Sequence, residues 1–244
     1  MTNTPAGGGG PPGGRSRGGK VRVKTAKRRT TSSNRWLERQ LNDPYVAAAR
    51  AAGYRSRAAF KLKELDAQFG LLAGVTRVVD LGAAPGGWCQ VVKQERPKAA
   101  VVGIDLLPVD PIPGVILFEK DILDDDAEAL ITQALGGPAD LVMSDMAANT
   151  VGHQATDHLR TMGLIEAGLD MATRLLRPGG NFVAKVLAGG GDGTLTAMLR
   201  KHFQSVKHVK PPASRKGSSE WYVVAQGFKA PAVAEVAEAA ADAG

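Results

Sequence analysis

From Val75 onward, short runs of β-branched and other apolar residues alternate with longer segments of helical spacing. Runs of roughly four to eight apolar residues bounded by turn residues are typical of buried strands. Strands that alternate with helices in this way indicate βαβ units and therefore an α/β fold. The expected strands lie at residues 75–79, 99–104, 114–118, 139–144, 181–187, 206–210 and 220–225.

Two longer segments have the spacing of amphipathic helices. In residues 58–69 the apolar positions fall on one face, and Ser56 is placed to cap the helix start. Lys61 lies beside that apolar face, where most lysines are simply solvated edge residues. Residues 157–176 form the second helix. We expect it to end at residues 177–180, because Arg-Pro-Gly-Gly is a helix stop signal.

The two ends of the chain differ in composition from its middle. Residues 1–37 contain no Asp or Glu, many glycines and many basic residues. We expect this arm to be disordered, because it cannot bury enough apolar surface to offset its chain entropy. Residues 38–229 should form a single domain, with a turn or helix start at 42–44. Residues 230–244 form an Ala/Glu-rich tail.

The net charge of the chain is +7, from 31 Lys and Arg against 24 Asp and Glu. A basic balance of this size favours a polyanionic partner, with RNA or DNA as the first candidates and an anionic membrane surface as the alternative. The arm can grip nucleic-acid phosphates without reading sequence, or it can act only as a solubilising tail. Arg55 and Arg57 stand near a helix start, where they oppose the helix dipole, which hints at another purpose such as phosphate binding.

Several classes of protein are disfavoured by what the sequence lacks. Cys89 is the single cysteine, so no intramolecular disulfide can form, which fits a reducing compartment. No apolar run is long enough to span a bilayer, and no signal-peptide segment opens the chain. The four histidines show no metal-ligand spacing, so we expect no metal site. We therefore expect a cytoplasmic, monomeric protein that does not associate with membranes.

Residues 80–88 read Asp-Leu-Gly-Ala-Ala-Pro-Gly-Gly-Trp and directly follow the first expected strand. Glycines let a backbone pass close to a ligand, and open α/β sheets bind ligands beyond the carboxyl ends of their strands. The spacing differs from the dinucleotide motif Gly-x-Gly-x-x-Gly, which disfavours an NAD(P) oxidoreductase. The acid at Asp80 suits a cationic or hydroxyl-bearing ligand, and S-adenosylmethionine fits that description. The alternative is an ordinary tight turn.

Charged side chains stand at or in the other expected strands. Asp105 lies about 20 residues beyond the glycine loop, where α/β folds place a carboxylate on ribose hydroxyls. Asp121 follows the third strand and can accept from an adenine amino group or remain a solvated loop acid. Asp145 follows the buried fourth strand and needs partners there. Lys185 lies in the apolar fifth strand with Asp145 as its expected partner, and Glu220 opens the last strand, where edge-strand glutamates are usually solvated.

Taken together, these motifs resemble the FtsJ/RrmJ family of ribose 2′-O-methyltransferases. The resemblance covers about residues 54–225. Its motifs are Tyr-Arg-Ser-Arg-Ala-Ala-Phe-Lys-Leu at 54–62, the glycine loop at 80–88, Asp-Leu-Leu-Pro at 105–108, Met-Ser-Asp-Met at 143–146 and Val-Ala-Lys-Val at 183–186. The resemblance implies a Rossmann-like, S-adenosylmethionine-dependent methyltransferase with a seven-stranded, mostly parallel sheet and helices on both faces. Ala148 departs from the family, which often has Pro there, and we expect this to alter loop stiffness more than chemistry.

The resemblance also implies a set of site residues. The family carries a catalytic Lys-Asp-Lys-Glu tetrad, for which the matching positions are Lys61, Asp145, Lys185 and Glu220. It further implies that the cofactor S-adenosylmethionine is contacted by Gly86, Trp88, Asp105, Asp121 and Asp145. Lys61 and Glu220, which periodicity alone leaves as solvated residues, thus gain a function from the resemblance.

Within the family, the resemblance is to bacterial enzymes that methylate a uridine ribose in 23S rRNA of the large ribosomal subunit. Methylation of tRNA ribose and RNA binding without turnover, as in ribosome assembly, are the alternatives. A ribose 2′-hydroxyl must lose its proton during attack on the methyl group. Our hypothesis is that Lys185 accepts that proton, with Lys61 supplying a like charge that favours a neutral amine. The competing hypothesis is that Lys185 stays protonated and only steers the oxygen.

Overall fold

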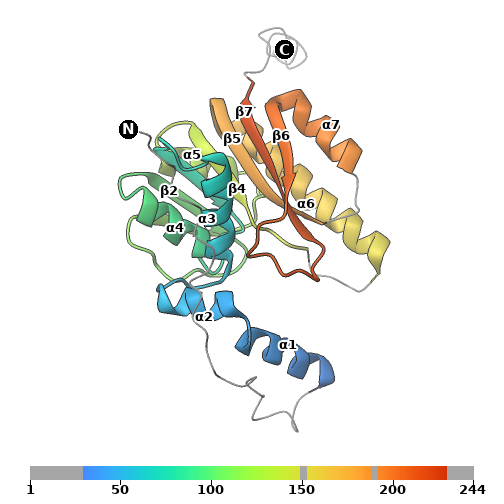
Figure 1. Cartoon of the computed structure of the whole chain (residues 1–244). Coiled ribbons are helices and arrows are strands. Elements are labelled where there is room, and N and C mark those ends of the chain that lie inside the picture. The colour runs from blue at the N-terminus through green and yellow to red at the C-terminus, as the bar shows by residue number, and fades with distance from the viewer. Residues whose placement is uncertain (1–29, 149–152, 188–191, 230–244) are drawn as a thin grey trace, which may run out of the picture.

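Residues 30–148, 153–187 and 192–229 are described by the computed structural model, and within them seven strands form one sheet (Figure 1). The strands are β1 (Arg77–Leu81), β2 (Ala100–Asp105), β3 (Val115–Glu119), β4 (Ala139–Ser144), β5 (Leu176–Leu187), β6 (Phe203–Val209) and β7 (Glu220–Phe228). Their order is β3-β2-β1-β4-β5-β7-β6. The first five in this order pair in parallel, whereas β7 is antiparallel to both neighbours. The expected seven-stranded, mostly parallel sheet is therefore confirmed.

Helices cover both faces of this sheet. The helices are α1 (Thr31–Leu41), α2 (Pro44–Ala51), α3 (Ala58–Phe69), α4 (Gly87–Glu95), α5 (Ala127–Leu135), α6 (Gln154–Leu175) and α7 (Asp192–His202). Apolar side chains of α3 and α4 join one core cluster, and those of α5, α6 and α7 join the other. In Figure 1, α1 and α2 extend beyond the sheet on the side where β6 and β7 are joined.

Alternate residues of each strand feed these two core clusters. In β1, Val78 packs with α3 and α4, whereas Val79 packs with α5, α6 and α7. The same alternation separates Leu141 from Val142 in β4. Strands buried on both faces are apolar at nearly every position. This explains why the parallel strands could be found in the sequence as continuous apolar runs.

Two boundaries differ from the expected ones in a way that matters for the site. Strand β1 begins two residues later than expected, so Asp80 lies inside the strand and not in the loop after it. Strand β5 begins at Leu176, so residues 177–180 do end α6 but already belong to the strand. The pairing of β4 with β5 has a register shift at this point, which accommodates the Arg-Pro-Gly-Gly sequence.

Ser56 does not cap α3, so this prediction was wrong. The N-cap position is Arg57, and no side chain bonds the first turn. Ser56 Oγ instead packs against Gly87, where an added Cβ would lie 2.6 Å away. The Ser56 side chain therefore lies in the contact between α3 and the start of α4 and does not cap α3.

The ordered part begins earlier than expected. Helix α1 starts at Thr31, seven residues inside the predicted arm, and Thr30 caps it through a hydrogen bond from Ser33 N. The helix start predicted at 42–44 is confirmed, with Asp43 as the N-cap and Pro44 in the first turn of α2. Residues 1–29 of the arm and the tail at 230–244 lie outside the described residues.

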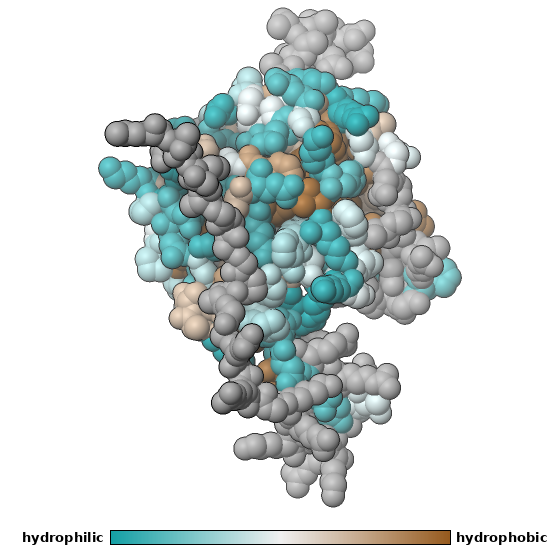
Figure 2. Space-filling model, in the orientation of Figure 1, coloured by the Kyte–Doolittle hydropathy of each residue, from teal (hydrophilic) through white to brown (hydrophobic). Residues whose placement is uncertain are grey.

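The surface toward the viewer in Figure 2 is mostly hydrophilic, with apolar residues visible in small areas only. Among the helices of the described residues, none combines the length and apolar character that crossing a membrane requires.

Candidate active site

A cavity of about 840 Å³ opens beyond the carboxyl ends of β1, β2, β3 and β4. The order of the strands reverses between β1 and β4, and open α/β sheets bind their ligands at such a switch point. Three acidic side chains that the sequence singled out, Asp105, Asp121 and Asp145, line this cavity together. The loops after the strands supply most of the other lining, and α6 closes one side with Arg160 and Gly163.

The glycine loop is shaped by contacts within the protein. Gly82 lines the cavity with a φ of 77°, and an added Cβ would lie 2.5 Å from the side chain of Met146. Gly86 has a φ of 102° and begins α4, where a Cβ would lie 2.6 Å from Ile112. Both glycines are therefore required by a positive φ and by close approach of neighbouring loops. Close approach of a ligand, which the motif predicted as the reason for these glycines, stays a prediction.

Neither Gly86 nor Trp88 is among the residues that line the cavity. The Trp88 ring is buried, its indole N–H donates to the carbonyl oxygen of Ala58 at 2.8 Å, and it packs against Tyr222. Trp88 thus ties α4 to the start of α3. Contact of these two residues with a cofactor stays a prediction.

Asp105 joins the glycine loop to the loop after β2. One carboxylate oxygen accepts from Ala84 N and the other from Leu107 N, both at 2.8 Å. Asp121 is held in the same manner by Leu123 N at 3.0 Å. A carboxylate oxygen has two lone pairs, so each can accept a further hydrogen bond from a ligand in the cavity.

Asp80 is buried behind the cavity and is not exposed on the loop. Burial raises its pKa to about 7, with Asp145 and Asp105 adding to the rise, while a hydrogen bond from the Cys89 thiol opposes it. Burial also raises the pKa of the Cys89 thiol well above its usual value. A buried thiol of raised pKa is a poor nucleophile, so Cys89 has a packing role.

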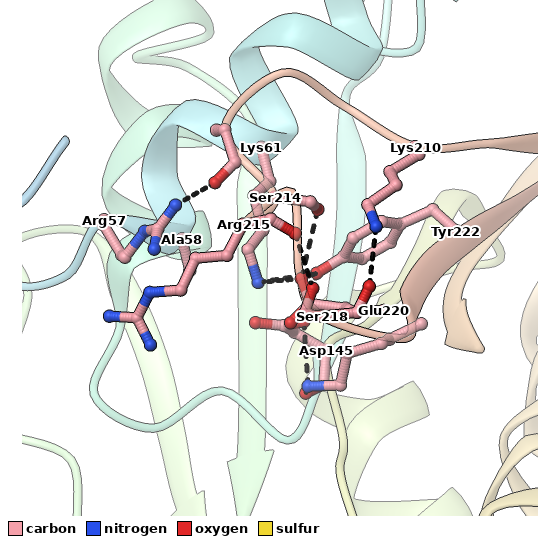
Figure 3. A network of polar contacts seen from close by, with 12 residues as sticks. Arg57, Ala58, Lys61, Asp145, Lys210, Ser214, Arg215, Ser218, Glu220 and Tyr222 are labelled. Atoms are coloured by element: carbon pink, nitrogen blue, oxygen red, sulfur yellow. Dashed lines mark hydrogen bonds and ion pairs between the residues drawn. The ribbon is translucent and has the colours of Figure 1, made fainter. Parts of the chain in front are cut away.

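Four side chains converge beside this cavity: Lys61 of α3, Asp145 after β4, Lys185 of β5 and Glu220 of β7. Figure 3 shows Lys61, Asp145 and Glu220 of this group. Lys185 Nζ lies 3.1 Å from Asp145 Oδ1, which confirms the partner predicted from the neighbouring strand ends. Lys61 forms an ion pair with Glu220. The side chain of Lys61 is only 9% exposed, so it is not the solvated edge residue that periodicity suggested.

Tyr222 joins the two ion pairs and was missed in the sequence. Its hydroxyl donates to Asp145 Oδ1 at 2.6 Å, lies 3.2 Å from Glu220 Oε1 and accepts from Lys61 Nζ at 3.0 Å (Figure 3). Burial, followed by the charges of Asp145 and Glu220, raises the pKa of Tyr222 well above its usual value, so the hydroxyl keeps its proton. The sequence signal that could have identified Tyr222 was its spacing of two residues from Glu220, because residues i and i+2 of a strand share a face.

Glu220 lies inside the sheet, and the expectation of a solvated edge glutamate was wrong. Strand β7 runs between β5 and β6, so it is not an edge strand. Glu220 accepts a second hydrogen bond from Ser214 Oγ at 3.3 Å, in the segment that joins β6 to β7. Its carboxylate is therefore held by three side chains, those of Lys61, Tyr222 and Ser214.

The two arginines near the start of α3 have protein partners. Arg57 binds the carboxylate of Asp43. Arg55 donates to three carbonyl oxygens, those of Pro85, Asp110 and Pro111. These contacts give both cations partners within the protein at a helix start, and phosphate binding by either of them stays a prediction. Across residues 30–148, 153–187 and 192–229, no three His, Cys, Asp or Glu side chains gather in a group that could hold a metal ion.

An α/β switch-point cavity with an adjoining lysine–carboxylate cluster is the arrangement that the resemblance to the FtsJ methyltransferases predicts. The FtsJ-like methyltransferase family matches residues 54–228, and the chain belongs to that family. The predicted family and fold are thereby confirmed.

Among curated proteins, the chain is similar to those named ribosomal RNA large subunit methyltransferase E. The protein from Novosphingobium aromaticivorans is 67% identical over 208 residues, covering 85% of this chain and 94% of the relative. The protein from Erythrobacter litoralis is 66% identical over 217 residues, covering 88% and 99%. A crystal structure described as a ribosomal RNA methyltransferase from Plasmodium falciparum has a TM-score of 0.65 and 30% identity, covering 72% of this chain and 98% of that one.

Proposed function

We propose that this protein transfers a methyl group from S-adenosylmethionine to the ribose 2′-hydroxyl of a uridine in 23S rRNA of the large ribosomal subunit. The observation that carries the proposal is the pair of ion pairs, Lys61–Glu220 and Lys185–Asp145, joined by Tyr222 beside the cavity. The similarity to proteins named large subunit rRNA methyltransferases supports rRNA as the substrate.

The residues of the cavity suit S-adenosylmethionine. This cofactor supplies a methyl group on a sulfonium, and it also has an ammonium group and ribose hydroxyls. Asp105 would bind the ribose hydroxyls, Asp121 the adenine amino group, and Asp145 lies nearest the lysines, where the cationic methyl donor belongs. Exposed Leu106 and Leu107 offer an apolar surface for the adenine ring. Gly86 and Trp88 belong to the glycine loop at 80–88, and their contact with S-adenosylmethionine stays a prediction.

The four charged residues and Tyr222 divide the chemistry between them. Lys185, as a neutral amine, accepts the proton that the 2′-hydroxyl loses. The oxygen would form its bond to the methyl carbon as the carbon–sulfur bond of the sulfonium breaks, which leaves a neutral thioether. Lys61 holds the same oxygen and places a second ammonium near Lys185. Asp145 and Glu220 fix the two lysines, and Tyr222 fixes the two carboxylates. In the competing mechanism Lys185 keeps its proton and only orients the oxygen.

The basic character of the chain supports an RNA partner. Lys216 is exposed and Arg215 half-buried in the segment beside the tetrad, and the net charge is +7. We propose that this segment and the arm at 1–37 hold RNA phosphates. We also propose that the protein is a cytoplasmic monomer that makes no contact with membranes.

The decisive experiment is transfer of a labelled methyl group to total RNA and then to isolated ribosomal subunits, with the modified ribose mapped. We expect one uridine of 23S rRNA to carry the label. Label in tRNA alone would contradict the substrate, and no label in any RNA would contradict the activity. Mapping therefore separates the substrate from its closest alternative.

The assignment of Lys185 is tested by Lys185→Ala. This variant should abolish transfer while its affinity for S-adenosylmethionine stays within about twofold, because the side chain acts on the 2′-hydroxyl. Lys63→Ala is the matched control, since Lys63 lies on the same helix as Lys61 and forms an exposed ion pair with Glu95 of α4. Near-normal turnover of Lys185→Ala would refute the assignment. A single-turnover rate without any ionisation near neutral pH would favour the steering mechanism.

A further inference from the structure

Two side chains of α3 and its N-cap hold the segment that joins β6 to β7, and Lys61 lies on the same face of the helix between them. Arg57, Lys61 and Glu64 are spaced by four and then three residues, so they project from the same side of the helix. Glu64 Oε2 accepts from the backbone N–H of Ala213 at 2.6 Å, and Arg57 donates to the carbonyl oxygen of Ala213. Both backbone groups of Ala213 are therefore fixed by the helix that carries Lys61.

Asp43 adds a third element to this arrangement. It is the N-cap of α2, where Oδ1 accepts from Tyr45 N at 3.0 Å. Its other oxygen, Oδ2, pairs with Arg57 and with Arg215, whose Nε lies 3.2 Å away. The Asp43 side chain is only 7% exposed, so one buried carboxylate joins α2, the start of α3 and residues 211–219.

This joint reaches the tetrad through Ser214, the residue after Ala213. Ser214 is buried and donates to Glu220 Oε1 at 3.3 Å, the oxygen that also pairs with Lys61. In Figure 3, Arg57 and Arg215 lie on one side of Ser214, and Glu220 and Tyr222 lie on the other. A small displacement of residues 211–219 would therefore move the Glu220 carboxylate relative to Lys61.

We propose that Asp43 is a positioning residue for methyl transfer, acting through Arg57 and Arg215 to hold residues 211–219 and so to set the Lys61–Glu220 pair. This inference rests on the proposed function, because it assigns to that pair a part in the reaction. It also gives a purpose to α1 and α2, which precede the residues matched by the family, 54–228. These helices would complete the active site.

The test is Asp43→Asn in the full chain. Asparagine caps a helix as well as aspartate does, so the start of α2 should survive. The substitution removes the charge and leaves Arg57 and Arg215 facing each other without their anion. We expect kcat to fall about tenfold, since small displacements of catalytic groups have effects of this size or larger. The affinity for S-adenosylmethionine should stay within about twofold, because Asp43 lies outside the cavity lining.

Asp140→Asn is the matched control. Asp140 is also a buried aspartate that pairs with an arginine, Arg177, and accepts from the backbone N–H groups of Thr76 and Arg77. It lies at the start of β4, whereas Asp145 follows the end of that strand. If Asp43 acts only on stability, the two variants should have equal kcat once compared at equal distance below their melting temperatures. That result would overturn the proposal.

Hydrogen exchange at the Ala213 amide gives a readout that does not depend on activity. Exchange should be at least several-fold faster in Asp43→Asn than in wild type and unchanged in Asp140→Asn. Adding Arg215→Gln to Asp43→Asn should recover part of both exchange protection and kcat, because it removes an unpaired cation. Unchanged exchange would overturn the proposal even in an active enzyme. A wild-type protein that methylates no RNA would overturn the proposed function instead, and exchange alone would then decide whether Asp43 holds the segment.

Discussion

The two halves of the sheet hold their carboxylates in different ways. In the half made of β1, β2 and β3, Asp80 accepts from a thiol, and Asp105 and Asp121 accept from backbone N–H groups, so all three are held by neutral donors. In the half made of β4, β5 and β7, Asp145 pairs with Lys185 and Glu220 pairs with Lys61. Both halves border the same crevice.

This difference separates two tasks. Neutral donors leave the carboxylates of the first half free to accept further hydrogen bonds from a ligand, so this half is suited to bind the hydroxyl and amino groups of the cofactor. The second half combines two lysines with two carboxylates, and the contacts between them keep the lysine side chains fixed. We therefore expect substitutions in the first half to change cofactor binding or stability, and substitutions in the second half to change the chemical step.

The largest expected effect follows from Asp145→Asn. The amide keeps the shape of the side chain but removes the anion that holds Lys185 and accepts from Tyr222. We expect the single-turnover rate at saturating cofactor and rRNA to fall by roughly 10³-fold, or about 4 kcal/mol of transition-state stabilisation. An effect on cofactor affinity alone, with an unchanged rate, would show that the second half of the sheet does not act on the chemical step.

Asp80 should make the stability of the cofactor-free protein depend on pH. Its pKa is raised from an unfolded value of 3.8 to about 7, mainly by burial, so the folded state binds the proton more tightly. Binding of this proton contributes its full amount to the free energy of unfolding when the pH is below 3.8, the pKa of Asp80 in the unfolded chain. The contribution is lost as the pH rises toward the folded-state pKa of about 7. Between pH 5 and pH 7 the loss should reach about 2–3 kcal/mol in the free energy of unfolding by denaturant.

Asp80→Asn isolates that contribution, since the amide cannot titrate. The difference in unfolding free energy between wild type and variant should shrink or reverse from pH 5 to pH 8, in favour of the variant at the higher pH. A difference that stays constant over this range would mean that Asp80 keeps the same protonation state in both folded and unfolded protein.

Asp105→Asn should act on binding. An amide has one acceptor oxygen, so it can keep only one of the bonds from Ala84 and Leu107 without turning an N–H group toward a donor. We expect calorimetry to show roughly tenfold weaker binding of S-adenosylmethionine, about 1.4 kcal/mol, with kcat at saturation within about threefold of wild type. A loss in kcat as large as that of Asp145→Asn would erase the distinction between the two halves.

The part of the site that the sequence could predict is the part built by parallel strands. Asp145 follows the end of β4 and Lys185 lies in the adjacent strand β5, and the ends of parallel strands lie at the same edge of a sheet. Apolar runs locate such strands, because both of their faces are buried. The pairing of these two residues therefore follows from local patterns together with one rule of topology.

The part that could not be predicted depends on the strand order at the other side of the sheet. Strand β7 enters between β5 and β6, and this places Tyr222 opposite Lys185 and makes Glu220 an interior residue. No local pattern encodes such an insertion. The same holds for Lys61, which is buried because the segment before β7 folds over α3, more than 140 residues away in the chain. Only the family resemblance identified this residue beforehand.

Tyr222→Phe tests the connection between the two ion pairs and has the smallest expected effect. The ring still fills its place against Trp88, while Asp145, Glu220 and Lys61 lose the hydroxyl that joins them. Both ion pairs remain, so we expect kcat to fall only about fivefold, near 1 kcal/mol, with cofactor affinity unchanged. Tyr54→Phe is the matched control, because it removes a hydroxyl that bonds Gln94 outside the site. If both variants lose the same stability and only Tyr222→Phe has a lower kcat, the Tyr222 hydroxyl orders the charged groups for reaction. Equal kcat values in the two variants would show that the hydroxyl contributes to stability alone.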